Sequence, residues 1–205
     1  AGAIRIISKK PDPTKFAAGY DLEGNSVSQG DTGFTAEGFL NIPLMQDRAA
    51  VRLVGWYERD AGYIDNVPTT HTFVQERVGG PDLTFDNAAA AGKDFNVAKT
   101  KGGRAALRFD LSDNWTATAM VLRQELDTQG VWDYDAAVGD LKVARLLPES
   151  ETDKFTQASL TLTGKLGGAT LTYTGSHLDR HYLQDLDYSL YSDYYISGSY
   201  VQAYY

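Results

Sequence analysis

The sequence predicts an all-β protein whose strands form one antiparallel up-and-down meander. Long segments alternate apolar with polar side chains at a period of two, as strands with two different faces do. These segments exceed the ~5–6 residues of an ordinary strand. Short turns and long irregular connections follow each other alternately along the chain. Strands of this length are long enough to cross a bilayer.

The composition narrows the class of protein. The 205 residues are 42% hydrophobic and 22% charged, and no run of about 18 apolar residues indicates a membrane helix. A membrane β-barrel is compatible with these averages because only half of each strand is apolar. The net charge of −8 argues against nucleic acid as a partner, since nucleic acid requires a basic surface. The absence of cysteine excludes disulfides, thiolate catalysis and cysteine-based zinc sites.

The segment Gly33–Asn66 holds the clearest strand pair. In its second strand Val51 and Leu53 point to one face and Arg52 points to the other. The first strand alternates in the same way, and a tight turn at 45–48 joins the two. The segment therefore predicts a long β-hairpin.

The other strands follow from the same pattern. Before this hairpin, the sequence predicts a short β run that Pro11 and Pro13 end, and then one strand. After it, the sequence predicts two more hairpins, with tight turns at 113–114 and 167–168, and one last strand. In order, the expected strands are 2–10, 15–25, 33–44, 49–60, 100–112, 115–126, 154–166, 169–182 and 196–205.

Three long connections, 61–99, 127–153 and 183–195, fall at one end of this meander, and the tight turns fall at the other. This asymmetry is typical of outer-membrane barrels, whereas a soluble sandwich more often has Greek-key connections. One face of the strands is apolar and the other carries charges of both signs, which suits a wet lumen or one filled by another polar domain. We therefore favour a membrane barrel over a soluble carbohydrate-binding β-domain.

No motif predicts catalysis or a cofactor. The sequence contains neither a nucleophile elbow nor a phosphate-binding loop. His177 and His181 are four residues apart, but four residues of strand span ~13 Å, too far for one metal ion with ligands at ~2 Å. We therefore expect no catalytic residue, no metal site and no bound cofactor.

Two groups of side chains are candidates for binding. Tyr188 and Tyr191 lie in the Asp- and Tyr-rich connection 183–195, where phenol rings would contact either a ligand or the lipid headgroup layer. The second group lies on the charged face, where it would contact a domain inside the barrel or guide an anionic cargo. It consists of Arg52, Arg104 and Arg108.

The sequence contains GAIRIISKKP at 2–11, and this stretch together with 38–53, 57–66 and 105–116 resembles TonB-dependent outer-membrane receptors. Gly2–Pro11, GAIRIISKKP, is similar to the last strand of the plug domain in that family, where Gly-x-Ile-x-Ile-x-Thr/Ser-Lys-x-Pro precedes the first barrel strand. Gly38–Leu53 resembles the second and third barrel strands, and Tyr57–Asn66 resembles the start of the next extracellular loop. Ala105–Thr116 is similar to the strand, periplasmic turn and strand that follow.

The resemblance implies a 22-stranded barrel in the outer membrane of a Gram-negative cell, closed around an N-terminal plug. Residues 1–13 would be the last plug strand and its linker, and 14–205 would be about eight barrel strands, so that the sequence is a fragment. The implied partners are outer-membrane lipid, the TonB complex through the earlier part of the plug, and an imported cargo such as a ferric siderophore, haem, cobalamin or a glycan. An alternative is a complete eight-stranded outer-membrane barrel, although this gives Gly2–Lys10 no role.

Overall fold

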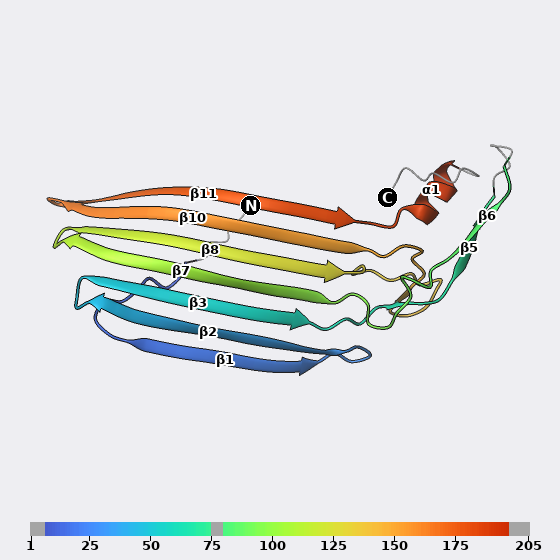
Figure 1. Ribbon diagram of the computed structural model, residues 1–205, viewed down its shortest axis with the longest axis horizontal. Coiled ribbons are helices and arrows are strands. Elements are labelled where there is room, and N and C mark those ends of the chain that lie inside the picture. The colour runs from blue at the N-terminus through green and yellow to red at the C-terminus, as the bar shows by residue number, and fades with distance from the viewer. Residues whose placement is uncertain (1–6, 75–79, 197–205) are drawn as a thin grey trace.

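The computed structural model describes residues 7–74 and 80–196, and within them the chain is all-β apart from one short helix. Seven long strands form a single antiparallel sheet in the order β1-β2-β3-β7-β8-β10-β11 (Figure 1). Each strand pairs with the next of the seven along the chain, so the predicted antiparallel meander is confirmed. The seven strands are β1 (Ala17–Ser26), β2 (Thr32–Met45), β3 (Ala49–Asp60), β7 (Ala98–Ser112), β8 (Trp115–Gln129), β10 (Ser150–Leu166) and β11 (Ala169–Asp185).

The two ends of the sheet differ, as Figure 1 shows. At the turn end, on the left of that view, residues 46–48, 113–114 and 167–168 join successive strands. Asp47 and Gly167 adopt the left-handed backbone that tight turns need, with φ of 58° and 61°. At the loop end, on the right, lie the two long connections between β3 and β7 and between β8 and β10, together with the shorter β1–β2 connection.

Strand pairing extends further toward the loop end than the sequence predicts. β8 continues to Gln129 rather than to residue 126, and β10 begins at Ser150 rather than at residue 154. The added residues are polar, and Thr152 Oγ1 donates a hydrogen bond of 3.0 Å to Asp127 Oδ1 across the two strands. Backbone pairing does not require apolar alternation, so the pattern underestimates the length of these strands.

The ends of the chain depart from the prediction. The expected connection 183–195 contains the end of β11 and a helix, α1 (Ser189–Ile196). Ile196 therefore ends a helix instead of beginning a strand, and 197–205 lie outside the described residues. Of the expected strand 2–10, residues 7–10 have no strand structure and the rest lies outside the described part. Among the described residues, no helix is long and apolar enough to cross a membrane.

The long connections have a structure of their own. β4 (Asp65–Asn66) pairs in parallel with β9 (Lys142–Val143), so the β3–β7 and β8–β10 connections interlock. β5 (Thr70–Phe73) and β6 (Leu83–Asp86) form a separate hairpin that projects from the loop end (Figure 1). The region predicted as an irregular stretch is therefore partly β-structured.

Buried amide side chains hold these connections together. Asn66 and Asn87 are each 1% exposed, and the Nδ2 atoms of both donate to the carbonyl oxygen of Arg145, at 3.1 and 3.0 Å. Asn96 is fully buried, and its Oδ1 accepts the backbone N–H groups of Tyr63 and Ile64. These hydrogen bonds satisfy backbone groups that the loops would otherwise bury unpaired.

A buried carboxylate fixes the segment before α1 to the same assembly. Asp187 Oδ2 accepts the N–H groups of Leu146 and Leu147, at 2.6 and 3.1 Å. In return, Glu149 Oε1 accepts the N–H of Asp187 at 3.0 Å. Burial raises the pKa of the Glu149 carboxyl above its ordinary value, and the nearby Asp187 charge adds to that increase. We call the interlocked connections and this segment the loop cap (residues 61–74, 80–97, 130–149 and 186–188).

The closest backbone packing in the loop cap occurs at Gly62. A Cβ atom at this position would overlap the carbonyl oxygen of Asp94. We expect Gly62→Ala to destabilise the protein by about 1–3 kcal/mol, because the backbone of the two segments must separate. Thermal unfolding should show a melting temperature lowered by several degrees. The matched control is Gly92→Ala, where no atom lies within 4 Å of the added Cβ, and an equal loss in that variant would contradict the explanation.

Candidate functional site

The face of the sheet that holds Leu53 is an exposed apolar surface, which we call the apolar face. Register places its members side by side: Leu40 pairs with Leu53, and Leu107 with Ala119. Five of its large aliphatic side chains are 40–45% exposed, far more than a core allows. They are Leu40, Leu53, Leu107, Val121 and Leu160. A contiguous apolar surface of this kind marks contact with a membrane or with another protein.

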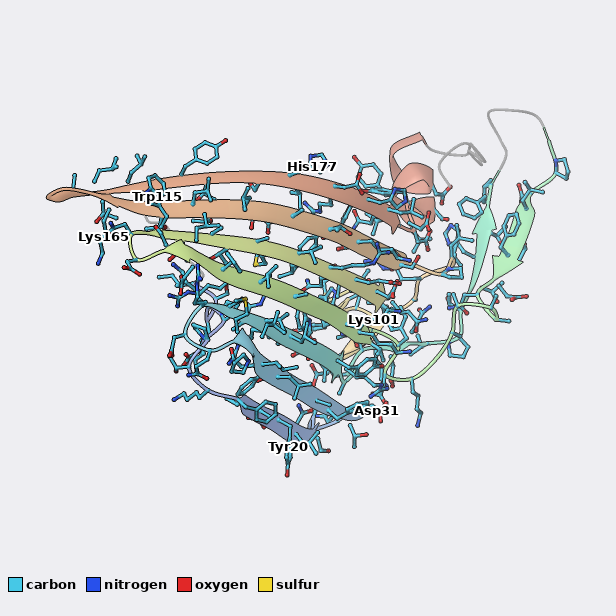
Figure 2. The ribbon with its side chains drawn as sticks, turned by 60° about the vertical axis from the view of Figure 1, so that its left-hand side comes forward. Tyr20, Asp31, Lys101, Trp115, Lys165 and His177 are labelled. Atoms are coloured by element: carbon cyan, nitrogen blue, oxygen red, sulfur yellow. The ribbon has the colours of Figure 1, made fainter. Side chains whose placement is uncertain are left out.

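Aromatic rings lie at both margins of this aliphatic band. On the loop-end side, Phe34 and Tyr57 stack with ring centroids 5.3 Å apart. On the turn-end side, Trp115 lies over Gly164, where an added Cβ would contact the indole ring, and Tyr173 is 62% exposed. Figure 2 shows Trp115 near the turn end and Tyr20, also on the apolar face, pointing away from the sheet.

The apolar band crosses the sheet obliquely. Toward the loop end, the first charged residue of the apolar face is Arg59 on β3, Lys101 on β7 and Arg123 on β8. Arg59 pairs with Lys99, and Lys101 pairs with Glu125, so the boundary moves two residues toward the turn end from β3 to β7 and again from β7 to β8. On β10 the first charged residue is Lys154, which pairs with Glu125, so the boundary moves two residues back there. Because paired residues lie on lines perpendicular to the strands, β3, β7 and β8 are tilted relative to the band.

The opposite, polar face carries charged and hydroxyl side chains along its whole length. On β8, β10 and β11 it is rich in threonine, and the Oγ1 atoms of Thr161 and Thr174 lie 3.1 Å apart. On β1, β2 and β3 it carries acids and Arg52. The contrast between the two faces agrees with the alternation in the sequence.

The segment before β1 lies against the polar face. Asn41 of β2 is 1% exposed, and it receives a hydrogen bond of 2.9 Å from the N–H of Asp12. Its Nδ2 donates to the carbonyl oxygens of Asp12 and Lys15, at 2.9 and 2.8 Å. Pro11 and Pro13 are buried beside this contact. The hydroxyl and N–H of Thr14 bond the Asp12 carboxylate and lower its pKa, so this carboxylate stays charged at neutral pH.

The structure brings the three predicted arginines together on one face. Arg52 on β3 and Arg104 on β7 are diagonal neighbours on the polar face, because Arg52 pairs with Ala106. Arg104 Nη2 also reaches the carbonyl oxygen of Lys9 at 3.4 Å. Arg108 is the diagonal neighbour of Arg52 on the other side of Ala106, nearer the turn end, and it is neutralised by Asp110, with nitrogen–oxygen distances of 3.0 and 3.1 Å.

Arg52 is the most constrained of these cations. It is 9% exposed, and its guanidinium lies 4.0 Å above the centre of the Phe39 ring. Within the described residues, its Nε has no hydrogen-bond partner. A cavity of about 400 Å³ opens beside it, lined by Lys9 and Arg104 among others. The carboxylates of Asp21 and Glu37 also line this cavity, so it carries charges of both signs.

Tyr188 and Tyr191 lie at the loop end, beside and within α1. They are 47% and 60% exposed, and their ring centroids are 6.0 Å apart in an edge-to-face arrangement. They are therefore close to each other and far from the arginines along the strands. His177 and His181 both lie on β11, and no group of three potential metal ligands comes together in the described part of the chain.

The sequence did not single out Asn41 as an anchor. It alternates with apolar residues as any polar-face residue does, and only the buried contact with Asp12 and Lys15 distinguishes it. The sequence offers one weak signal, an amide residue two positions before Pro43 within a strand pattern.

Comparisons of the chain with protein-family models, with curated proteins and with solved structures found no match.

Asn41→Ala tests whether this amide holds the segment on the polar face. The variant loses three hydrogen bonds, which corresponds to about 2–3 kcal/mol. We expect trypsin to cleave after Lys15 at least roughly tenfold faster, because the segment opens more often. Asn25→Ala, an exposed amide on neighbouring β1, is the control and should leave cleavage unchanged. Unchanged cleavage in Asn41→Ala would show that other contacts hold the segment.

Proposed function

We propose that this chain is part of the wall of a TonB-dependent outer-membrane receptor, a 22-stranded barrel that imports a scarce ligand. In this proposal residues 14–205 belong to the barrel and 1–13 to the end of the plug domain and its linker. The observation that carries it is the segment before β1, which packs on the polar face while the opposite face is an exposed apolar band. That arrangement fits a chain which leaves the lumen and enters the wall.

The apolar face supports a lipid environment. An aliphatic band with aromatic rings at both margins is the usual outer surface of a membrane barrel. Its oblique course agrees with strands that tilt, typically by 35–45°, relative to the barrel axis. Beyond the band, charges on this face are paired: Glu125 Oε1 lies 2.9 Å from Lys154 Nζ and 3.4 Å from Lys101 Nζ. Paired charges just beyond the apolar band, on its loop-end side, are compatible with a position in the lipid headgroup layer.

The edges of the sheet support a larger barrel. Within the described residues, β1 and β11 each pair on one side only. Lipid tolerates no open sheet edge, since unpaired backbone groups there find no water. Further strands at both edges would close the sheet.

The polar face supports a filled lumen. Arg52 and Arg104 line a cavity together with Lys9, Asp21 and Glu37, and a charged cavity on this face is compatible with a polar domain inside the barrel. In this proposal Arg52 and Arg104 contact the plug, and Arg108 with its Asp110 partner lines the lumen nearer the turn end. Transport would then combine ligand binding at the loop end with a plug movement driven by the TonB complex, without covalent chemistry.

Cysteine accessibility tests the proposed orientation, because the chain has no native cysteine and each variant adds one thiol. Lys93→Cys and Ala136→Cys add exposed thiols at the loop end, and Asp113→Cys and Gly168→Cys add them at the turn end. Intact Gram-negative cells that express the receptor with this segment in its complete barrel are treated with a membrane-impermeant maleimide. We expect labelling at 93 and 136 alone, and labelling at 113 and 168 only after the outer membrane is permeabilised.

Two outcomes would contradict the proposal. One is equal labelling of both ends in intact cells. The other is recovery of the protein from the soluble fraction. A folded but inverted protein would label at the turn end alone, which would reject the orientation.

A further inference from the structure

We propose that a pocket at the loop end of the polar face binds a saccharide. This inference deepens the proposed function and rests on it in one respect, namely that the loop end faces the medium. The pocket has a volume of about 360 Å³, within the range of small-molecule sites. Its lining includes Thr128, Trp132, Asp133, Glu151, Gln184 and Leu186.

Three polar side chains form the floor of the pocket in one row across the sheet. Glu151 of β10 pairs with Thr128 of β8 on one side and with Gln184 of β11 on the other. Gln184 Nε2 donates to Glu151 Oε2 at 3.3 Å, which orients both groups. Tyr182 also hydrogen-bonds Glu151. A carboxylate can accept about four hydrogen bonds in all, so this row can still accept from hydroxyl groups and donate to them.

Trp132 supplies an apolar surface above this row. It is 51% exposed, and the ring of Tyr63 lies 6.3 Å from it at a tilt of 58°. The connection that carries Trp132 begins at Gly130, whose φ is 68° and whose N–H donates to the carbonyl oxygen of Glu149 at 2.9 Å. Gly130 also packs against Phe95, and a Cβ atom at position 130 would contact that ring. The backbone beside Trp132 is therefore already ordered in the free protein, so ligand binding costs little conformational entropy there.

This combination selects the class of ligand. The faces of a sugar ring are made of C–H groups and stack on an indole, and its rim of hydroxyls donates to carboxylates. A purely apolar ligand would displace water from Glu151 without replacing the hydrogen bonds of that water, which would reduce the binding free energy. The charge of Asp133 is partly offset by Arg145, with an N–O distance of 3.5 Å, so the pocket does not present an undivided acidic surface for a cation. A neutral ligand rich in hydroxyl groups fits both the aromatic and the polar components.

Isothermal calorimetry on the purified protein in detergent tests the inference. The probes are maltohexaose, cellohexaose and xylohexaose, with a ferric hydroxamate chelate as a cargo of other chemistry. We expect one oligosaccharide to bind with a Kd between about 10 μM and 1 mM. Trp132→Ala should weaken that binding at least roughly tenfold by removing the stacking surface. Glu151→Gln, which keeps the side-chain shape, should weaken it by about tenfold.

Tyr134→Ala is the matched control, because Tyr134 is equally exposed in the same connection and is not among the residues that line the pocket. Its affinity should equal that of the parent. Absence of heat with all three oligosaccharides at about 10 mM would overturn the inference, and so would tighter binding of the ferric chelate. Unchanged affinity in both Trp132→Ala and Glu151→Gln would also overturn it.

The two proposals fail in different ways. If no saccharide binds but loop-end cysteines alone label on intact cells, the saccharide site is rejected and the outer-membrane assignment stands. If saccharide binding depends on Trp132 but the cysteines label equally at both ends, the outer-membrane assignment is rejected and the site stands.

Discussion

The unbroken antiparallel register from β1 to β11 is the constraint on which the rest of the structure depends. Because the side-chain period of a strand is two, one register gathers the aliphatic band on one face and most of the polar side chains on the other. A slip of one residue between β3 and β7 would put Arg104 on the apolar face. The two faces, the oblique band and the position of Arg52 beside the cavity therefore follow from the same hydrogen-bond ladder.

The loop cap depends on a different interaction, the buried side-chain amide. Asn66 and Asn87 hold two connections that are far apart in sequence through one carbonyl oxygen, and Asp187 adds the segment before α1. These contacts pair backbone N–H and carbonyl groups inside the loop cap, which allows long loops to hold a fixed shape without a large apolar core. The proposed saccharide site depends on this ordered loop cap, because the cap fixes the backbone that carries Trp132.

The sheet could be predicted from the sequence, and most of the loop structure could not. Alternation in segments such as 49–60 reports directly on the two faces, so the sequence correctly predicts the seven strands of the sheet and the three short turns, but not the expected strands 2–10 and 196–205 or the strand ends at the loop end. α1 was missed because Ser189–Ile196 has no amphipathic period and lies in a stretch rich in tyrosine. Neither the pairing of β4 with β9 nor the role of Asn41 has a local signature, since each depends on a partner distant in the chain. Trp132 had one available signal, an aromatic residue outside any alternating segment.

The central claim is that the apolar face contacts lipid while the polar face encloses protein and water. Spin labels on single cysteines test it most directly, with the protein in bilayers and collision rates measured against oxygen and a water-soluble nickel chelate. At Leu53, Leu107 and Leu160 we expect high accessibility to oxygen and low accessibility to the nickel chelate. Thr118 on β8 and Thr161 on β10, both on the polar face, should show low accessibility to oxygen. Equal accessibility of the two faces to the nickel chelate would contradict the account.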